Sequence, residues 1–106
     1  MEITDVRIVL RNDDRLKAYA TITLDGCFVV RRLRIIQTGD RLFVAMPARR
    51  KSDGTFQDIA HPINAAMRAK LEERVIADYL RELRDAGGAN GRGRTFHEDD
   101  ADDGDD

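Results

Sequence analysis

The sequence predicts a single small α+β domain, in which an antiparallel sheet of four to five strands is packed by a C-terminal helix. Three observations lead to this fold class. Residues up to Met46 alternate apolar and polar side chains between short turn-forming stretches, and residues 65–84 repeat apolar side chains at three- and four-residue spacing. A chain of 106 residues has room for one domain. Connections as short as these join antiparallel strands, because parallel pairs need a long crossover.

The first two predicted strands cover about residues 2–11 and a segment centred on residues 18–24. In the first, every second residue is apolar, and Arg7 and Arg11 point to the opposite side. In the second, one face is apolar and the other carries Tyr19 and two threonines, a composition typical of strands. The residues that share the apolar face are Val6, Ile8, Leu10, Ala18, Ala20, Ile22 and Leu24.

Turn signals define the next two strands. Asp25-Gly26 favours a type I′ hairpin turn. A third strand is predicted from Cys27 to about Gln37, and a fourth from Leu42 to Met46, where Pro47 stops it. Cys27 is expected to be a buried or half-buried strand residue. As the single cysteine of the chain, it excludes an intrachain disulfide and a cysteine-based zinc site.

The segment between Pro47 and Pro62 follows no regular period. Three consecutive cations precede an Asp53-Gly54 turn. A short strand around residues 55–59 is predicted after that turn, in a position to pair back onto the sheet.

The predicted helix runs from about Ala65 to Arg84, with Asn64 as its N-cap and Gly87-Gly88 as its stop. Its apolar face is expected to cover the sheet, since one face of a half-buried sheet needs a partner layer. The residues of that helix face are Met67, Leu71, Val75, Ile76, Leu80 and Leu83.

Charge divides the chain into a domain, residues 1–85, and a tail, residues 86–106. The tail has a Gly/Arg stretch followed by an acidic run, and we expect it to be disordered. The formal net charge of −2 separates into +4 for residues 1–84 and −6 for residues 85–106, so the body is basic. The N-terminus has no signal-peptide pattern, and no apolar run approaches the roughly 18 residues of a membrane span. A cytoplasmic location is predicted.

Motifs for enzymatic chemistry are missing from the sequence. Gly87, Gly88, Gly91 and Gly93 follow a helix, which is the wrong context for a phosphate loop. Asp53, Asp58 and His61 form the one cluster to test as an acid/base set, and the competing interpretation is that they shape turns. We therefore predict no catalytic residues, metal site, cofactor or small-molecule substrate.

Clustered cations are the best candidates for function. Arg49, Arg50 and Lys51 lie on the predicted loop, where they can attract phosphates and release counterions. The competing interpretation is a solvated charge run. Phe43 and Phe56 fit strand-core roles, so the sequence does not support base stacking. The third strand adds three further cations to the predicted nucleic-acid-binding set, namely Arg31, Arg32 and Arg34.

The central segment contains three distinctive runs, namely Leu42-Phe43-Val44-Ala45-Met46-Pro47, Asp53-Gly54, and Asp58-Ile59-Ala60-His61-Pro62-Ile63-Asn64. Together they resemble the SpoVG family of bacterial septation regulators, and the resemblance extends over about residues 1–83. It implies a dimer built on a sheet with a C-terminal helix, and roles in cell division, the cell cycle, sporulation and gene regulation through DNA or RNA. The family's basic pair falls on Arg49 and Arg50. Two departures are Lys51-Ser52, where the family commonly has Thr-Pro, and Gln57, where it often has Arg.

Two hypotheses about function follow. The leading one is a dimeric nucleic-acid-binding regulator that uses the basic loop, with the acidic tail as a candidate competitor for that loop. The alternative is a protein-interaction adaptor of the division machinery that makes no direct contact with nucleic acid. Weak salt dependence of binding would favour the adaptor.

Overall fold

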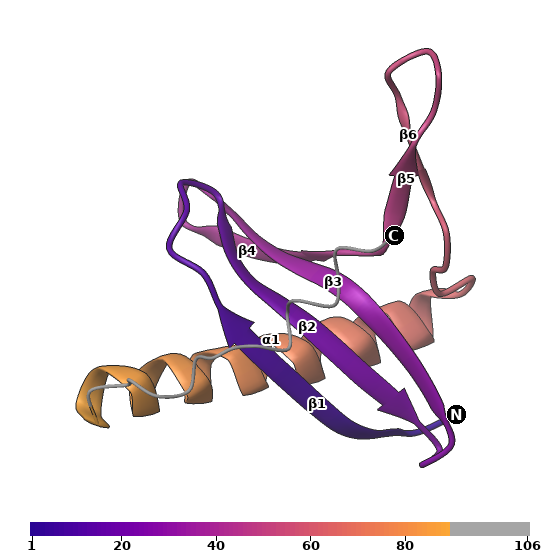
Figure 1. Cartoon of the computed structure of the whole chain (residues 1–106). Coiled ribbons are helices and arrows are strands. Elements are labelled where there is room, and N and C mark those ends of the chain that lie inside the picture. The colour runs from indigo at the N-terminus through magenta and orange to yellow at the C-terminus, as the bar shows by residue number, and fades with distance from the viewer. Residues whose placement is uncertain (90–106) are drawn as a thin grey trace.

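The computed structural model describes residues 1–89 and confirms the α+β class. Its main sheet contains β1 (Ile3–Leu10), β2 (Leu16–Leu24), β3 (Phe28–Thr38) and β4 (Arg41–Ala45), in the order β1-β2-β3-β4 with every pair antiparallel. A separate two-stranded hairpin follows, made of β5 (Ala48–Arg50) and β6 (Phe56–Asp58). The chain then enters the helix α1 (Ala65–Ala89), which lies across one face of the sheet (Figure 1).

The core lies between that sheet face and α1. The alternation of β2 is reproduced in its burial, since every second residue from Ala18 to Leu24 is buried. The largest side chains with no appreciable exposure are Ile22, Leu33, Ile35 and Val75. Side chains from the sheet and the helix interlock there, so the packing of these apolar residues stabilises the two layers together.

The helix begins where the sequence predicted, and its buried face differs from the prediction. The backbone N–H of Met67 donates to Oδ1 of Asn64 at 2.7 Å, which confirms the N-cap. Tyr79 is buried, whereas Leu80 and Leu83 are exposed. Leu71, Val75 and Tyr79, spaced four residues apart, form the buried stripe of the helix. Figure 1 also shows the last turns of α1 extending past the edge strand β1.

The end of the helix also differs from the prediction. The helix continues through the Gly87-Gly88 pair to Ala89. Glycine lowers helix stability by about 1 kcal/mol without forbidding the helical conformation. The predicted tail therefore contributes its first residues to α1, and the rest of that prediction, residues 90–106, lies outside the described part of the chain.

The β2–β3 turn has the predicted type I′ geometry. Asp25 and Gly26 have φ angles of 51° and 65°, and the N–H of Cys27 donates to the carbonyl of Leu24 at 2.9 Å. Cys27 itself is exposed, so the expectation of a buried or half-buried strand residue was wrong. It closes the turn and precedes the strand, where the helix does not cover it.

The short strand predicted around residues 55–59 was expected in a position to pair back onto the sheet, and it pairs with β5 instead. Pro47 has no N–H to continue the β3–β4 ladder, so the chain leaves the sheet after Ala45. The N–H of Ile59 donates to the carbonyl of Pro47 at 2.7 Å and closes the base of the hairpin. The hairpin consequently projects away from the body (Figure 1).

Within residues 1–89, no helix has the length and the apolar character that a membrane crossing requires.

Candidate nucleic-acid interface

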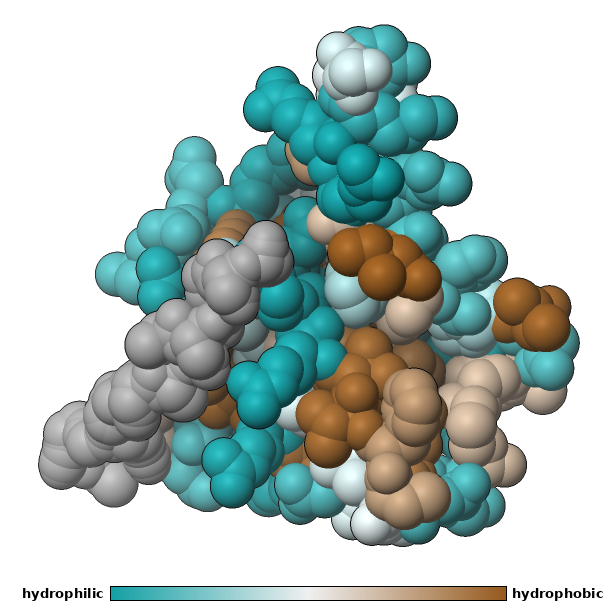
Figure 2. Space-filling model, turned by 45° about the vertical axis from the view of Figure 1, so that its right-hand side comes forward, coloured by the Kyte–Doolittle hydropathy of each residue, from teal (hydrophilic) through white to brown (hydrophobic). Residues whose placement is uncertain are grey.

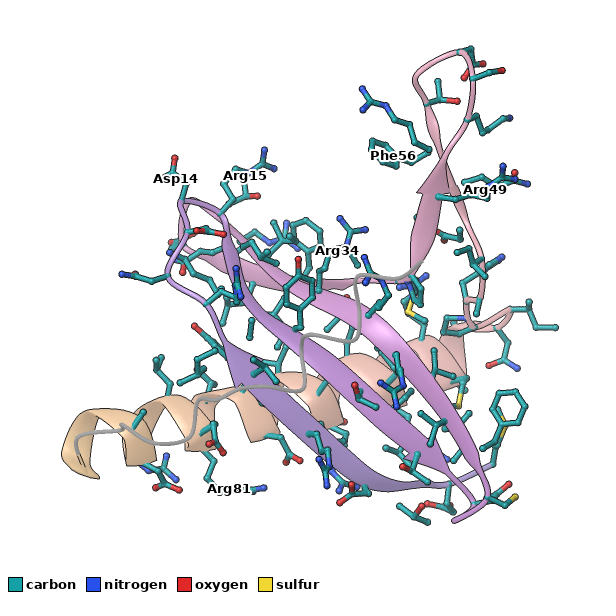
Figure 3. The ribbon with its side chains drawn as sticks, in the orientation of Figure 1. Asp14, Arg15, Arg34, Arg49, Phe56 and Arg81 are labelled. Atoms are coloured by element: carbon teal, nitrogen blue, oxygen red, sulfur yellow. The ribbon has the colours of Figure 1, made fainter. Side chains whose placement is uncertain are left out.

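The hairpin carries the three predicted loop cations, and all of them are exposed. The register pairs Arg49 with Gln57 and Arg50 with Phe56. Because side chains alternate along a strand, Arg50 and Phe56 share one face and Arg49 lies on the other. Figure 3 shows Phe56 and Arg49 pointing to opposite sides of the hairpin. The sequence suggested one cationic cluster, and the structure distributes it over two faces.

Phe56 is among the most exposed large apolar residues of the described chain, at 68 %. The guanidinium carbon of Arg50 lies 5.8 Å from the centroid of its ring, within cation–π range. The interpretation of Phe56 as a core residue was therefore wrong. It assumed that the short strand joins the main sheet, where an apolar ring would be covered.

Phe43 also departs from its predicted core role. It pairs with Ile36 of β3, and its side chain is on the sheet face that α1 does not cover. We call this uncovered side of the β1–β4 sheet the open face.

The hairpin tip is ordered by one carboxylate. Oδ1 of Asp53 accepts a hydrogen bond from the Thr55 hydroxyl at 2.7 Å and another from the Thr55 N–H at 3.0 Å. These two bonds, the hydroxyl first, lower the pKa of Asp53 below its ordinary value. Asp53 therefore shapes the turn, as the second of the two sequence interpretations proposed. The tip remains a short, charged turn held by local bonds.

The β3 arginines are presented by a β-bulge. Ala20 pairs with Leu33 and Ile22 pairs with Val30, so Arg31 and Arg32 together lie opposite Thr21. Arg32 adopts a left-handed φ of 70°. Without the extra residue, alternation would turn Arg32 toward the helix-covered core; with it, both arginines are exposed.

A further arginine joins this group, and it was not among the binding residues predicted from the sequence. Arg7 of β1 pairs with Thr21 from the other side. The open face therefore carries arginines on both sides of Thr21. Finding Arg7 from the sequence would have required the strand register, because Arg7 and Arg31 are far apart along the chain.

Arg34 has a different position from the other predicted site residues. It is half-buried, and its Nη2 donates to the carbonyl of Met46 at 3.3 Å. Figure 3 shows Arg34 on the side of the sheet from which the hairpin rises. This bond joins β3 to the segment that leads into the hairpin, so Arg34 helps to position the other cations.

Asp58 is the last residue of β6 and His61 follows the hairpin, and both are exposed. Nδ1 of His61 is 3.2 Å from the carbonyl oxygen of Pro62, its neighbour in the chain. Among residues 1–89, no three potential metal-ligating side chains converge. The geometry at His61 is that of a residue in contact with its local backbone.

An apolar groove of about 440 Å³ opens beside these residues, and the sequence did not reveal it. Segments that are distant in the chain converge on it, and Figure 2 shows apolar residues gathered on this side of the molecule. Phe28 and Ile63, exposed by 63 % and 88 %, add apolar surface in this region. The main lining residues are Met1, Leu24, Phe28, Met46, Pro62 and Met67.

Comparison with known proteins agrees with the resemblance seen in the sequence. The model of the family SpoVG matches residues 1–81. Relatives described as "Putative septation protein SpoVG" include one from Anaeromyxobacter sp. (strain K), which is 54 % identical over 93 % of this chain and 100 % of its own. Another, from Myxococcus xanthus, is 51 % identical over 81 % of this chain and 87 % of its own. A third, from Geobacillus thermodenitrificans, is 51 % identical over 82 % and 98 %.

Proposed function

This chain belongs to the SpoVG family of septation proteins, and we propose that it acts as a cytoplasmic regulator of septation and gene expression that binds DNA or RNA as a dimer. The observation that carries the proposal is the β5–β6 hairpin. It holds Arg49, Arg50 and Lys51 exposed and away from the body, at a place that an extended polyanion can reach.

The electrostatics of the hairpin support phosphate binding. Within residues 1–89, no carboxylate forms an ion pair with Arg49, Arg50 or Lys51. Cations that are not neutralised by the protein retain counterions, which bound phosphates release. Arginine also offers two parallel donors to a phosphate. Arg7, Arg31 and Arg32 extend the same sign of charge over the open face.

The proposal is tested by measuring affinity for labelled single- and double-stranded DNA and RNA over a salt series. A variant with Arg49→Ala, Arg50→Ala and Lys51→Ala loses three phosphate contacts. The slope of log affinity against log salt should therefore flatten by roughly two to three units. A wild-type protein that binds none of these nucleic acids at low salt would refute the proposal.

A matched control removes the same charge elsewhere. Arg15, Arg68 and Arg84 make no side-chain hydrogen bond or ion pair within residues 1–89. Their combined replacement by alanine should leave the salt slope close to that of the wild type. If this control flattens the slope as much as the hairpin variant does, the binding reflects net charge and the hairpin is not the site.

We attribute dimerisation to the apolar groove and the exposed residues around it. Contiguous exposed apolar surface on a small domain indicates an interaction site, and a second copy is the partner that the resemblance implies. Phe28→Asp should convert a dimer to a monomer in light-scattering measurements of molar mass, whereas Phe56→Asp should not. A wild-type protein that is monomeric at micromolar concentration would contradict this assignment.

The same groove favours a second candidate function, that of an adaptor for a division protein. In that case, the groove would take apolar side chains of the partner and the hairpin cations would contribute little. The two experiments above separate the candidates. An adaptor would be monomeric with an unoccupied groove, would bind no nucleic acid at low salt, and would bind its partner with little dependence on salt.

A further inference from the structure

We propose that Phe56, with Arg50 beside it, is a stacking site for a base of single-stranded nucleic acid. This inference rests on the proposed nucleic-acid function and adds to it the class of nucleic acid that the hairpin prefers. The ring would take the base, and the cations of the hairpin would take the flanking phosphates.

Burial in the core does not explain why an aromatic residue occupies position 56. Its side chain is 68 % exposed, so little of its apolar area is removed from water in the monomer. The residues around it in the hairpin are hydrophilic, including Arg49, Arg50 and Gln57. Phe56 also lies outside the buried core between the sheet and α1. Phe56 is therefore an exposed ring beside the cations of the β5–β6 hairpin, and a ligand can reach it.

The pairing of Arg50 with Phe56 matches the two ends of a nucleotide. The two residues are direct cross-strand partners, and the guanidinium carbon lies 5.8 Å from the ring centroid. An aromatic ring offers a face to any base, and a guanidinium donates to phosphate or stacks on a base itself. Since each nucleotide joins a base to a phosphate, a ring and a cation held side by side can contact both parts.

Single strands fit this site better than duplexes. In a duplex, each base is already stacked on its neighbours, so a ring gains a base face only by paying for unstacking. In a single strand, the base faces are accessible, and stacking on an aromatic side chain tolerates every base. The inference therefore predicts a preference for single strands with little dependence on sequence. A hairpin that enters the major groove as a β-ribbon would show the opposite preference.

A tryptophan substitution provides a direct test, because the chain contains no tryptophan. In Phe56→Trp, the indole is the unique tryptophan and reports on stacking by loss of fluorescence. We expect a single-stranded DNA oligonucleotide to quench it in parallel with binding measured by anisotropy. The duplex of the same sequence should quench it much less at equal occupancy. Leu83→Trp, at an exposed position of α1, is the control and should not be quenched.

The affinities of Phe56 variants distinguish base stacking on Phe56 from the more general proposal that the hairpin binds nucleic acid. Phe56→Ala should weaken single-strand binding by about 5- to 150-fold and leave the salt slope unchanged, because a ring carries no charge. Phe56→Tyr should retain wild-type affinity. Phe56→Leu should lose affinity as the alanine variant does, since it keeps an apolar side chain and removes the flat ring. Circular dichroism checks that these exposed substitutions leave the fold intact.

Three results would overturn the inference. If Phe56→Ala binds like the wild type while the triple hairpin variant loses its salt slope, the hairpin binds nucleic acid without stacking. If the duplex quenches Phe56→Trp as fully as the single strand does, the ring acts as a wedge in duplex DNA and the single-strand preference is wrong. If the wild type binds no nucleic acid at low salt, the proposed function fails together with the inference.

Discussion

Arg32 offers a test of how the β3 bulge is built. Its φ of 70° lies in the left-handed region, which costs a residue with a Cβ roughly 1–2 kcal/mol. Glycine adopts this conformation without that cost, although it loses about 0.5–1 kcal/mol more than alanine through chain entropy. The substitution Arg32→Gly therefore relieves backbone strain that Arg32→Ala retains.

The comparison between these two variants isolates the backbone. Both remove the guanidinium, so contacts of the arginine side chain cancel in the difference. We expect Arg32→Gly to exceed Arg32→Ala in the free energy of unfolding by up to about 1 kcal/mol. At Arg31, whose φ is not in the left-handed region, the order should reverse, because glycine in a strand is destabilising by roughly 0.5–1 kcal/mol.

Urea denaturation followed by circular dichroism measures this difference. With a slope of about 1–3 kcal/mol per molar urea, the two midpoints at position 32 should differ by up to roughly 0.3–1 M. All variants are compared at one protein concentration, because dimerisation would shift the apparent stability. The reasoning is refuted if Arg32→Ala is as stable as Arg32→Gly, or if positions 31 and 32 respond with the same sign.

Three further predictions concern the core, the helix cap and the hairpin tip. Leu33→Ala removes a fully buried side chain and should lower the free energy of unfolding by about 2–5 kcal/mol in the same urea assay, whereas Leu83→Ala, at an exposed position, should change it little. Asn64→Ala leaves the Met67 N–H without its cap and should cost about 0.5–2 kcal/mol in thermal or urea melts; Asn64→Asp should retain most of that stability, and an equal loss in both would contradict the capping role. Thr55→Val should raise the pKa of Asp53 toward 3.8 in an NMR titration of its carboxyl carbon, because the hydroxyl that favours the carboxylate is gone. The pKa of Asp53 is lower in the folded protein than its ordinary value of 3.8, so this contact stabilises the fold above pH 3.8. That stabilisation is lost as the pH falls through the folded pKa. Any difference in stability between wild type and Thr55→Val should therefore shrink in acid.

Most of the secondary structure was predictable because it depends on local patterns. The period-two alternation of β2, the Asp25-Gly26 turn and the Asn64 cap each act within a few residues, and all three are present. The same locality explains the good prediction of where α1 begins. The assignment of the basic segment to an exposed position was also correct, since three consecutive cations resist burial.

The wrong predictions of burial concern residues whose exposure depends on which other elements pack against them. Leu80 and Leu83 continue the apolar pattern of α1, and they are exposed because the buried stripe of the helix runs through Leu71, Val75 and Tyr79. Phe56 has the composition of a core residue, and it is exposed because its strand pairs only with β5. Neither outcome can be derived from spacing along the chain. Each depends on the extent of the partner layer.

Local sequence patterns were enough to predict the α+β class, the meander of four strands, the helix start and a basic segment before Asp53. These features follow from hydrophobic periodicity and turn chemistry, which act over a few residues. Three features required the three-dimensional arrangement. The hairpin stands apart from the sheet, the bulge opposite Thr21 turns Arg31 and Arg32 to the open face, and an apolar groove forms at Phe28. The physical reason is that exposure and direction depend on contacts between segments far apart in the chain, and those contacts exist only after the layers have packed.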